Sequence, residues 1–528
     1  MSLPQQSPRA TTPIFKTKLV LAVILGLIGM IVFFGPTDNW SWDPSFYYAQ
    51  VRSPIIDRDL DFSNETVTGG KPVINPETGL QESAWPIGPS ILWSPFFILA
   101  HLIVLLFNPS QGDGFYFPYI ALVAIGSIGY GLAGLFITYR AVRYFANWFL
   151  SIVATVLGLA ATPLFFYTFR QPFMAHTTGL FASALIVFVY LMLAEREGLS
   201  KESGLLFGVS LALCFLTRWN GLLLAIVPAI YFFDHFLRSL RQRSRKNLRD
   251  LLVQLLVLAG VFILTISPQL SLWYRLDHSF LVIPQSGTAF VDSILPVNLP
   301  KIFFDTNRGL IYWSPYVLLG IVGMFFIPDV KVRLMAIISV LSQIVLIGYR
   351  VDWYSGGGFG ARYFIEFIPF IAIGFVSLLQ KLPERINWKP VISIGTAILI
   401  AHQMNLMYAV EHGSDGWINL GNYLKGNSVG VRWQLNSVVK LVRDPTLWFA
   451  RRPYVASDRQ TIITNLLSGR LNPKVYFLTG TATIAFLVMM ILACLLRKVM
   501  KKHNAKNFFL GILAYFFAWS IYLFLVGM

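Results

Sequence analysis

Long apolar runs restrict this chain more than any other feature, because a helix of roughly 20 apolar residues crosses the ~30 Å hydrocarbon core of a bilayer. Only 13% of the 528 residues are charged, against about 25% in a soluble domain. We therefore predict an all-α polytopic membrane protein with about 13 transmembrane helices. The predicted spans are residues 17–34, 116–138, 149–168, 174–193, 203–217, 220–235, 251–273, 310–327, 333–349, 363–380, 390–408, 476–496 and 507–526.

Basic loops between these spans orient the chain. Residues 238–249 hold six Lys and Arg, residues 497–506 hold five, and residues 381–389 hold three. Cytoplasmic loops carry the excess of basic residues. These loops and the N-terminus are therefore expected inside, in a multi-pass protein of the plasma (inner) membrane. The segments then expected on the outer face are 35–115, 274–309, 350–362 and 409–475.

One apolar run, Ile91–Phe107, does not fit this orientation as a span. Counting it would place Arg140 and Arg143 outside and would reverse every later loop. Proline residues at 86, 89 and 95 also disfavour one continuous helix through the region. We predict that this segment lies along the outer face or dips into it.

The net charge of +17 does not require a nucleic-acid partner. The basic residues are distributed as the membrane topology demands, and anionic lipid accounts for the excess. The two cysteines, Cys214 and Cys494, lie in apolar runs and form no metal-binding motif. We expect membrane lipid, and no nucleic acid, as a partner.

Acidic residues concentrate in the first outer segment, where residues 35–90 hold eight of the 25 in the chain. A carboxylate at a membrane surface can act as a general base on a hydroxyl or hold a divalent cation that screens phosphate. We hypothesise a Mg²⁺ or Mn²⁺ ion bound by Asp57, Asp59 and neighbouring acids, and no organic cofactor. The alternative is a solvated acidic loop with interfacial aromatic residues.

Three motifs resemble those of one enzyme superfamily. Residues 42–48 (WDPSFYY), with Arg52 and residues 57–65 (DRDLDFSNE), resemble the first outer loop of GT-C membrane glycosyltransferases. This superfamily includes protein O-mannosyltransferases, lipid A aminoarabinose transferases and oligosaccharyltransferases. Residues 85–89 (WPIGP) are similar to the segment before its juxtamembrane helix, and residues 357–364 (GGFGARYF), followed by Pro369, resemble a late outer-loop motif of the bacterial branch.

The resemblance implies a transferase that moves a sugar from a polyprenyl-phosphate-linked donor to a hydroxyl of a glycan, lipid or protein acceptor, with inversion. By match, Asp43 is the general base. Many relatives have Asp-Glu where this chain has Asp43-Pro44, so any role of that second acid must come from elsewhere or be absent.

The resemblance, together with the apolar runs and basic loops, also divides the chain. Residues 17–410 form the GT-C-like transmembrane catalytic module, within which residues 35–115 are the acidic outer loop and juxtamembrane helices. Residues 1–16 form a cytoplasmic tail, residues 411–475 a basic amphipathic outer segment, and residues 476–528 a C-terminal transmembrane hairpin.

Polar residues at the predicted outer ends of the spans are candidates for binding donor phosphate or sugar. Arginine binds phosphate through two parallel hydrogen bonds from its guanidinium, and glycine lets a backbone approach a ligand closely. The alternatives are snorkelling arginines, a buried structural histidine and an Arg350–Asp352 pair. The candidates are Arg170, Gln171, His176, Arg218, Asn220, Arg308, Arg350, Arg362 and Tyr363.

The segment 431–452 alternates apolar and basic residues as an amphipathic helix does. It either packs on the helical bundle or lies on the outer leaflet, where it would help recruit acceptor or anionic lipid.

Two other functions stay open for the whole chain. One is a secondary transporter, although transporters place ionisable groups near the bilayer midplane in related halves. The other is a non-catalytic lipid- or glycan-binding relative with the same fold.

Overall fold

The computed structural model describes residues 42–65, 74–83, 85–196, 198–282, 290–383, 385–411, 418–444 and 505–526. Within these residues the protein is helical, and its only β pairings are the isolated bridges Ile74–Gln81 and Phe290–Arg350. The predicted spans 17–34 and 476–496, the tail 1–16 and most of the segment 411–475 lie outside the described residues.

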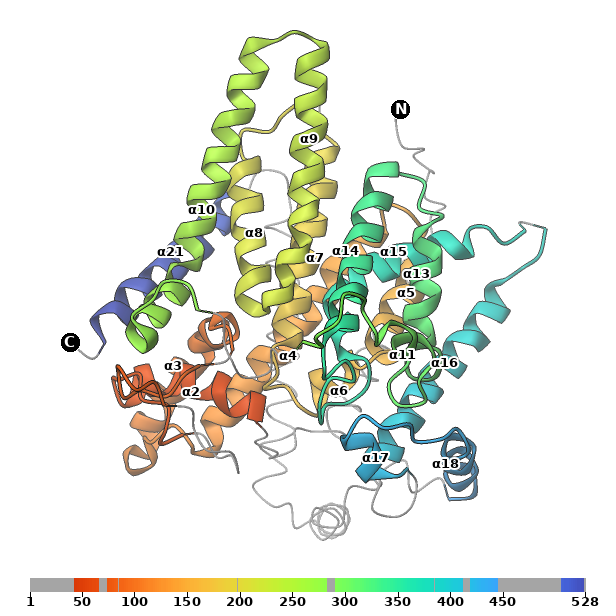
Figure 1. The fold of residues 1–528 in the computed structure, drawn as a ribbon, viewed down its shortest axis with the longest axis horizontal. Helices are drawn as coiled ribbons and strands as arrows, with labels where there is room; N and C mark the ends of the chain where they lie inside the picture. Colours follow the sequence, from red (N-terminus) through yellow and green to blue (C-terminus); the bar gives the residue numbers. More distant parts are fainter. Residues whose placement is uncertain are drawn as a thin grey trace.

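The helices follow the order of the predicted spans (Figure 1). They are α2 (Trp42–Ile56), α3 (Gly88–Phe107), η1 (Pro109–Gln111), α4 (Phe117–Val142), α5 (Trp148–Ala160), α6 (Leu164–Phe169), α7 (His176–Ala194), α8 (Ser203–Thr217), η2 (Trp219–Ala225), α9 (Ile226–Arg241), α10 (Arg245–Asp277), α11 (Leu299–Phe304), α12 (Leu310–Trp313), α13 (Pro315–Met324), α14 (Val330–Tyr349), η3 (Arg362–Phe367), α15 (Ile368–Leu379), α16 (Lys389–Glu411), α17 (Leu420–Leu424), α18 (Arg432–Arg443) and α21 (Ala505–Leu525).

Nine helices of the described ranges are long and apolar enough to cross a membrane, which confirms a polytopic, all-helical membrane protein. They are Gly88–Phe107, Pro118–Val142, His176–Ala194, Trp219–Arg241, Arg245–Asp277, Val330–Tyr349, Arg362–Leu379, Lys389–Val410 and Ala505–Leu525. The helices α5, α8 and α13 are apolar but shorter, so the predicted total of about 13 spans is not established.

Proline divides two of the predicted spans. The run 149–168 separates into α5 and α6 around Pro163, and the run 310–327 separates into α12 and α13 at Ser314-Pro315. Proline has no N–H to continue the hydrogen-bond ladder, and its ring crowds the preceding turn. The two breaks leave short helical pieces at one end of the bundle, close to the polar motifs.

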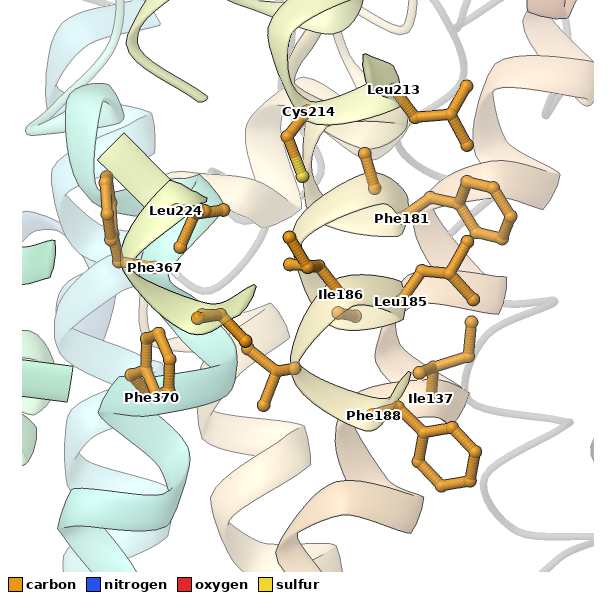
Figure 2. Packing of buried hydrophobic residues seen from close by; sticks show 14 of the residues in the cluster. Ile137, Phe181, Leu185, Ile186, Phe188, Leu213, Cys214, Leu224, Phe367 and Phe370 are labelled. Carbon is orange, nitrogen blue, oxygen red and sulfur yellow. The ribbon is translucent and has the colours of Figure 1, made fainter. Parts of the chain in front are cut away.

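The centre of the bundle is α7, whose residues 176–193 are all buried. Figure 2 shows its Phe181, Leu185 and Phe188 on the side of Ile137 of α4, with Cys214 of the adjacent α8 close by. A second tight contact joins α13 and α15, where a Cβ on Gly374 would lie 2.2 Å from the Gly320 carbonyl oxygen. Glycine is needed there because the two backbones nearly touch.

The loops alternate between two ends of the bundle. At one end Asp234 binds Lys331 at 2.6 Å and Arg238 at 2.8 Å, beside the basic segment 238–249 at the tip of the α9–α10 hairpin (Figure 1). The opposite end, here called the site end, carries residues 161–175, 218–225, 290–314 and 350–367. The basic loops therefore lie opposite the polar motifs; which end faces the cytoplasm stays a prediction.

Helix α3 coincides with the apolar run that was predicted not to span the membrane. By length and composition it could be a span. Some of its partners lie at the site end, while Phe96 packs on Tyr130 in the middle of α4 and Ser94 is hydrogen-bonded to Tyr515 in the middle of α21. Gly88 abuts Leu216 at the end of α8, Trp93 contacts Phe173 before α7, and Phe97 packs on Tyr119 at the start of α4. The placement of this segment along the outer face stays a prediction.

Candidate functional site

Asp43 and Arg362 form an ion pair at the site end. The Oδ2 atom of Asp43 lies 3.1 Å from Nη1 of Arg362, and the two side chains are 21% and 13% exposed. Asp43 stands in the first turn of α2, where Pro44 is tolerated and a carboxylate favours the positive helix end. The pair joins residues 319 positions apart, and both were predicted site residues.

The glycine-rich loop 355–361 sets the position of Arg362. A Cβ on Gly358 would lie 2.8 Å from both Nε of Arg362 and the Tyr167 hydroxyl, so only glycine allows this packing. The N–H of Phe359 donates to the Tyr167 hydroxyl at 2.7 Å. The Nε of Arg362 is buried and has no hydrogen-bond partner among the described residues. This guanidinium therefore has donor capacity left for a ligand.

One turn further along, Glu366 joins two more of the predicted residues. Its Oε1 lies 3.3 Å from Nε of Arg218 and 3.1 Å from Nδ1 of His176. Nη1 of Arg218 lies 3.0 Å from that same His176 nitrogen, and the imidazole packs on the Tyr167 ring with centroids 4.4 Å apart. The Oε2 of Glu366 is buried without a partner in the described part of the chain. The three residues form a polar cluster inside an apolar bundle, an environment where such groups must be paired.

A chain of hydrogen bonds connects Arg218 to η3. Its Nε donates to Oδ1 of Asn220 at 3.4 Å, and Nδ2 of Asn220 donates to Oε1 of Gln343 at 3.1 Å. The amide of Gln343 donates in turn to the Tyr363 carbonyl oxygen at 2.9 Å. The predicted residues Arg218, Asn220 and Tyr363 are thus brought together, through a glutamine that the sequence did not single out.

Arg350 and Tyr363 meet at Asp352. Arg350 donates to the two carboxylate oxygens of Asp352 at 2.8 and 3.0 Å, and the Tyr363 hydroxyl donates to Oδ2 at 3.0 Å. The centroid of the Tyr363 ring lies 5.4 Å from the Cζ of Arg350 and 5.8 Å from that of Arg218. The structural Arg350–Asp352 pair considered from the sequence is therefore present, and it borders the polar cluster.

Arg308 differs from the other arginines of the site because each of its guanidinium nitrogens already has protein acceptors. Nη2 donates to the carbonyl oxygens of Gly356 and Gly358, and Nε donates to that of Gly358. Nη1 donates to the Tyr423 carbonyl and to Oδ1 of Asn307. Burial lowers the pKa of Arg308. The residue fastens the glycine-rich loop to the segment that carries Tyr423.

Arg170 and Gln171 lie in the turn that leads into α7, six and five positions before His176. Arg170 is buried and Gln171 is half-buried. They share the site end with the other predicted residues.

The carboxylates predicted to bind a metal have protein partners. Arg52 contacts Asp57 at 2.5 Å and Glu65 at 2.6 Å, and the Ser53 hydroxyl donates to Asp59 at 2.6 Å. Burial raises the pKa of Glu65 to about 8, although Arg52 opposes the shift. Among the described residues no group of three or more His, Cys, Asp or Glu side chains is arranged to hold a metal ion. The divalent cation stays a prediction.

Sequence reasoning missed Glu366 and Tyr47. A carboxylate within the apolar run Arg362–Leu379 is costly unless it is paired, and this could have identified Glu366. Tyr47 lies one turn beyond Asp43 on α2 and is 4% exposed. Burial raises its pKa, and the charges of Arg218, Asp43, Arg362 and Glu366 all act on it. The tyrosine therefore lies within electrostatic reach of both ion-paired groups.

No protein-family model matches the chain, and no curated protein matches it in sequence. Two solved structures are similar to it. One is the crystal structure of ArnT from Cupriavidus metallidurans bound to undecaprenyl phosphate, with 15% identity, a TM-score of 0.48 and coverage of 97% of this chain and 78% of that chain. The other is the same protein in the apo state, with 13% identity, a TM-score of 0.46 and the same coverage.

Proposed function

We propose that the protein is a membrane glycosyltransferase that moves a sugar from a polyprenyl-phosphate-linked donor to an acceptor hydroxyl, with inversion. The observation that carries the proposal is the Asp43–Arg362 ion pair, with the Arg218–His176–Glu366 cluster one turn further along η3. It supplies a carboxylate and guanidinium groups at one end of an apolar bundle. The resemblance of the first-loop and glycine-loop motifs to GT-C enzymes supplies the substrate class.

The chemistry needs a base for the acceptor and cations for the leaving group. In the proposed reaction the carboxylate of Asp43 takes the proton of the acceptor hydroxyl, and the oxygen attacks the anomeric carbon. The bond from that carbon to the phosphate oxygen breaks, and the phosphate keeps the electron pair. Arg362 and Arg218 stabilise the negative charge that develops there.

The arrangement around Arg362 agrees with this division of roles. Its Nη1 holds Asp43, while its Nε is buried without a partner among the described residues. A phosphate oxygen that accepted a hydrogen bond from this Nε would place the leaving group on the guanidinium that also holds the base, Asp43. The bond between Arg362 and Asp43 would thus set the distance from base to leaving group, which positioning catalysis requires.

The proposed reaction takes place on the outer face. This orientation is supported by the basic segments 238–249 and 381–389, which lie at the end of the bundle opposite Asp43. The acceptor is a hydroxyl of a glycan, lipid or protein.

The test is the Asp43→Asn variant, purified and reconstituted with short-chain polyprenyl-phosphate-linked sugars. Release of polyprenyl phosphate, followed by mass spectrometry, reports transfer whichever sugar is used. We expect a loss of about 10²–10⁴-fold with an unchanged thermal unfolding temperature. Asp61→Asn is the matched control, because Asp61 lies in the same acidic segment and accepts the N–H of the nearby Ser63. Full turnover by Asp43→Asn would refute the mechanism.

A further inference from the structure

Helix α18 presents an apolar stripe that the described part of the protein leaves uncovered. The side chains of Leu435, Val438, Val439 and Val442 are 69%, 45%, 46% and 74% exposed. Their spacing of i, i+3, i+4 and i+7 places them on one face of the helix, since each residue advances about 100°. Four aliphatic side chains in a contiguous exposed row indicate a contact surface.

The remaining positions of α18 divide into two further faces. Trp433, Ser437 and Leu441 are buried and hold the helix on the bundle, where the Trp433 ring lies 5.7 Å from that of Trp313. The third face carries Arg432 and Arg443, both exposed. At about 100° per residue, Arg432 and Arg443 lie directly beside Val439 on the helix circumference. The cations therefore border the apolar stripe on the side away from the protein core.

The charge around this stripe is predominantly positive. Residues 418–444 hold Lys425, Arg432, Lys440 and Arg443, against a single acid, Asp444. An apolar stripe bordered by cations matches the boundary between acyl chains and anionic headgroups, because arginine stems cover apolar surface while their charged ends reach phosphate.

The position of α18 in the fold places it at the membrane surface. The Tyr423 hydroxyl donates to the Gly358 carbonyl oxygen at 2.8 Å, so the α17–α18 segment is attached at the site end. Figure 1 places α17 and α18 at the lower end of α16, a helix apolar and long enough to span a membrane. A helix fixed at the end of a span lies at the depth where the bilayer meets water.

We propose that α18 is an interfacial helix that inserts Leu435, Val438, Val439 and Val442 into the lipid leaflet at the site end, with Arg432 and Arg443 bound to anionic headgroups. This proposal does not depend on the glycosyltransferase activity. It assigns to the segment after α16 a lipid-binding surface next to the glycine-rich loop. The helix would anchor that loop at a fixed height above the acyl chains.

The test places an environment-sensitive fluorophore on single cysteines of the full chain, in a background in which Cys494 is replaced by serine and the buried Cys214 is retained. Leu435→Cys and Val442→Cys report the apolar stripe, and Asn436→Cys reports the polar side of the same helix. Leu256→Cys, at an exposed position of α10, serves as the lipid-facing reference. The proteins are reconstituted in phosphatidylcholine vesicles that contain brominated phosphatidylcholine, with or without phosphatidylglycerol.

We expect bromine quenching at positions 435 and 442 to exceed that at 436 by at least about twofold and to increase when phosphatidylglycerol is present. Arg432→Gln with Arg443→Gln should remove that increase. Equal quenching at 435, 442 and 436 would overturn the proposal. Disulfide crosslinking between two copies of the Leu435→Cys protein, in place of quenching, would also overturn it and would assign the stripe to a second copy. Quenching that is the same with and without phosphatidylglycerol would overturn the proposed contact of Arg432 and Arg443 with anionic headgroups.

Discussion

Arg308, which is buried, and Arg362, which is half-buried, both contact the glycine-rich loop, and they differ in what their donors bind. The guanidinium nitrogens of Arg308 all have protein acceptors, mostly backbone carbonyls. Arg362 holds Asp43 and has a buried Nε without a partner among the described residues. A guanidinium whose donors are all used stabilises the fold, whereas one with a free donor beside a carboxylate is suited to bind a ligand.

The sharpest test of this difference is Arg362→Lys. Lysine keeps the charge but loses the planar guanidinium that holds Asp43 and that, in the proposed reaction, also binds phosphate. We expect polyprenyl-phosphate release to fall by about 10²–10³-fold, the cost of removing one donor from a developing oxyanion. Thermal unfolding followed by intrinsic fluorescence should change little, because the neighbouring Tyr167 and glycine contacts remain. A large loss of stability with normal turnover would instead mean that Arg362, like Arg308, stabilises the fold and does not bind phosphate.

Arg308→Lys should give the reverse result. The lysine ammonium cannot reach the carbonyls of Gly356, Gly358 and Tyr423 together, which leaves buried acceptors unpaired at about 1–3 kcal/mol each. We expect a lower unfolding temperature and a lower yield of folded protein. The protein that does fold should retain its affinity for polyprenyl phosphate, measured with a fluorescent analogue. Wild-type stability with lost lipid binding would make Arg308 a ligand residue.

A substitution of Glu366 tests whether Arg218 binds a ligand, as proposed for Arg362, or stabilises the fold, as Arg308 does. Glu366→Gln keeps the shape of the side chain but removes the charge that holds Arg218 and His176. If Arg218 binds phosphate, the KM for donor should rise by about tenfold, or ~1.4 kcal/mol, with a smaller change in kcat.

The matched control for Glu366 is Glu202→Gln, which removes a more exposed pair with Arg196 at 3.2 Å. Its effect should stay within about 0.5 kcal/mol. A Glu366→Gln protein with unchanged KM and lowered stability would restrict Glu366 to the fold.

The sequence predicted the helical membrane architecture and several of the site residues, because apolar length and basic loops act locally. It identified Asp43 and Arg362 separately, but their pairing across 319 positions depends on how α2 packs against η3. It gave Arg308 and Arg362 the same interpretation, since the acceptors of Arg308 are carbonyls that exist only once residues 356–358 and 423 have folded together. Glu366 was missed because its neighbours are apolar, although the cost of a charge in such a run was itself a clue.

The arginine–carboxylate cluster of Arg52 with Asp57 and Glu65 predicts a pH dependence of stability. Burial raises the pKa of Glu65 to about 8, above the ordinary value of 4.5. Between these two values the folded protein holds a proton that the unfolded chain has lost, so the free energy of unfolding falls as the pH rises from about 5 to 8. Glu65→Gln should reduce this slope by on the order of 1 kcal/mol per pH unit, while Arg52 keeps Asp57 as its partner.

Unfolding temperatures measured across that pH range should therefore converge for the wild-type and Glu65→Gln proteins at low pH. They should separate at high pH, with the variant the more stable, because only the wild-type protein must release a proton from a buried carboxyl. A slope that is unchanged in Glu65→Gln would mean that Arg52 keeps the carboxylate ionised. Arg52 would then be held by two full charges, where Arg362 is held by one.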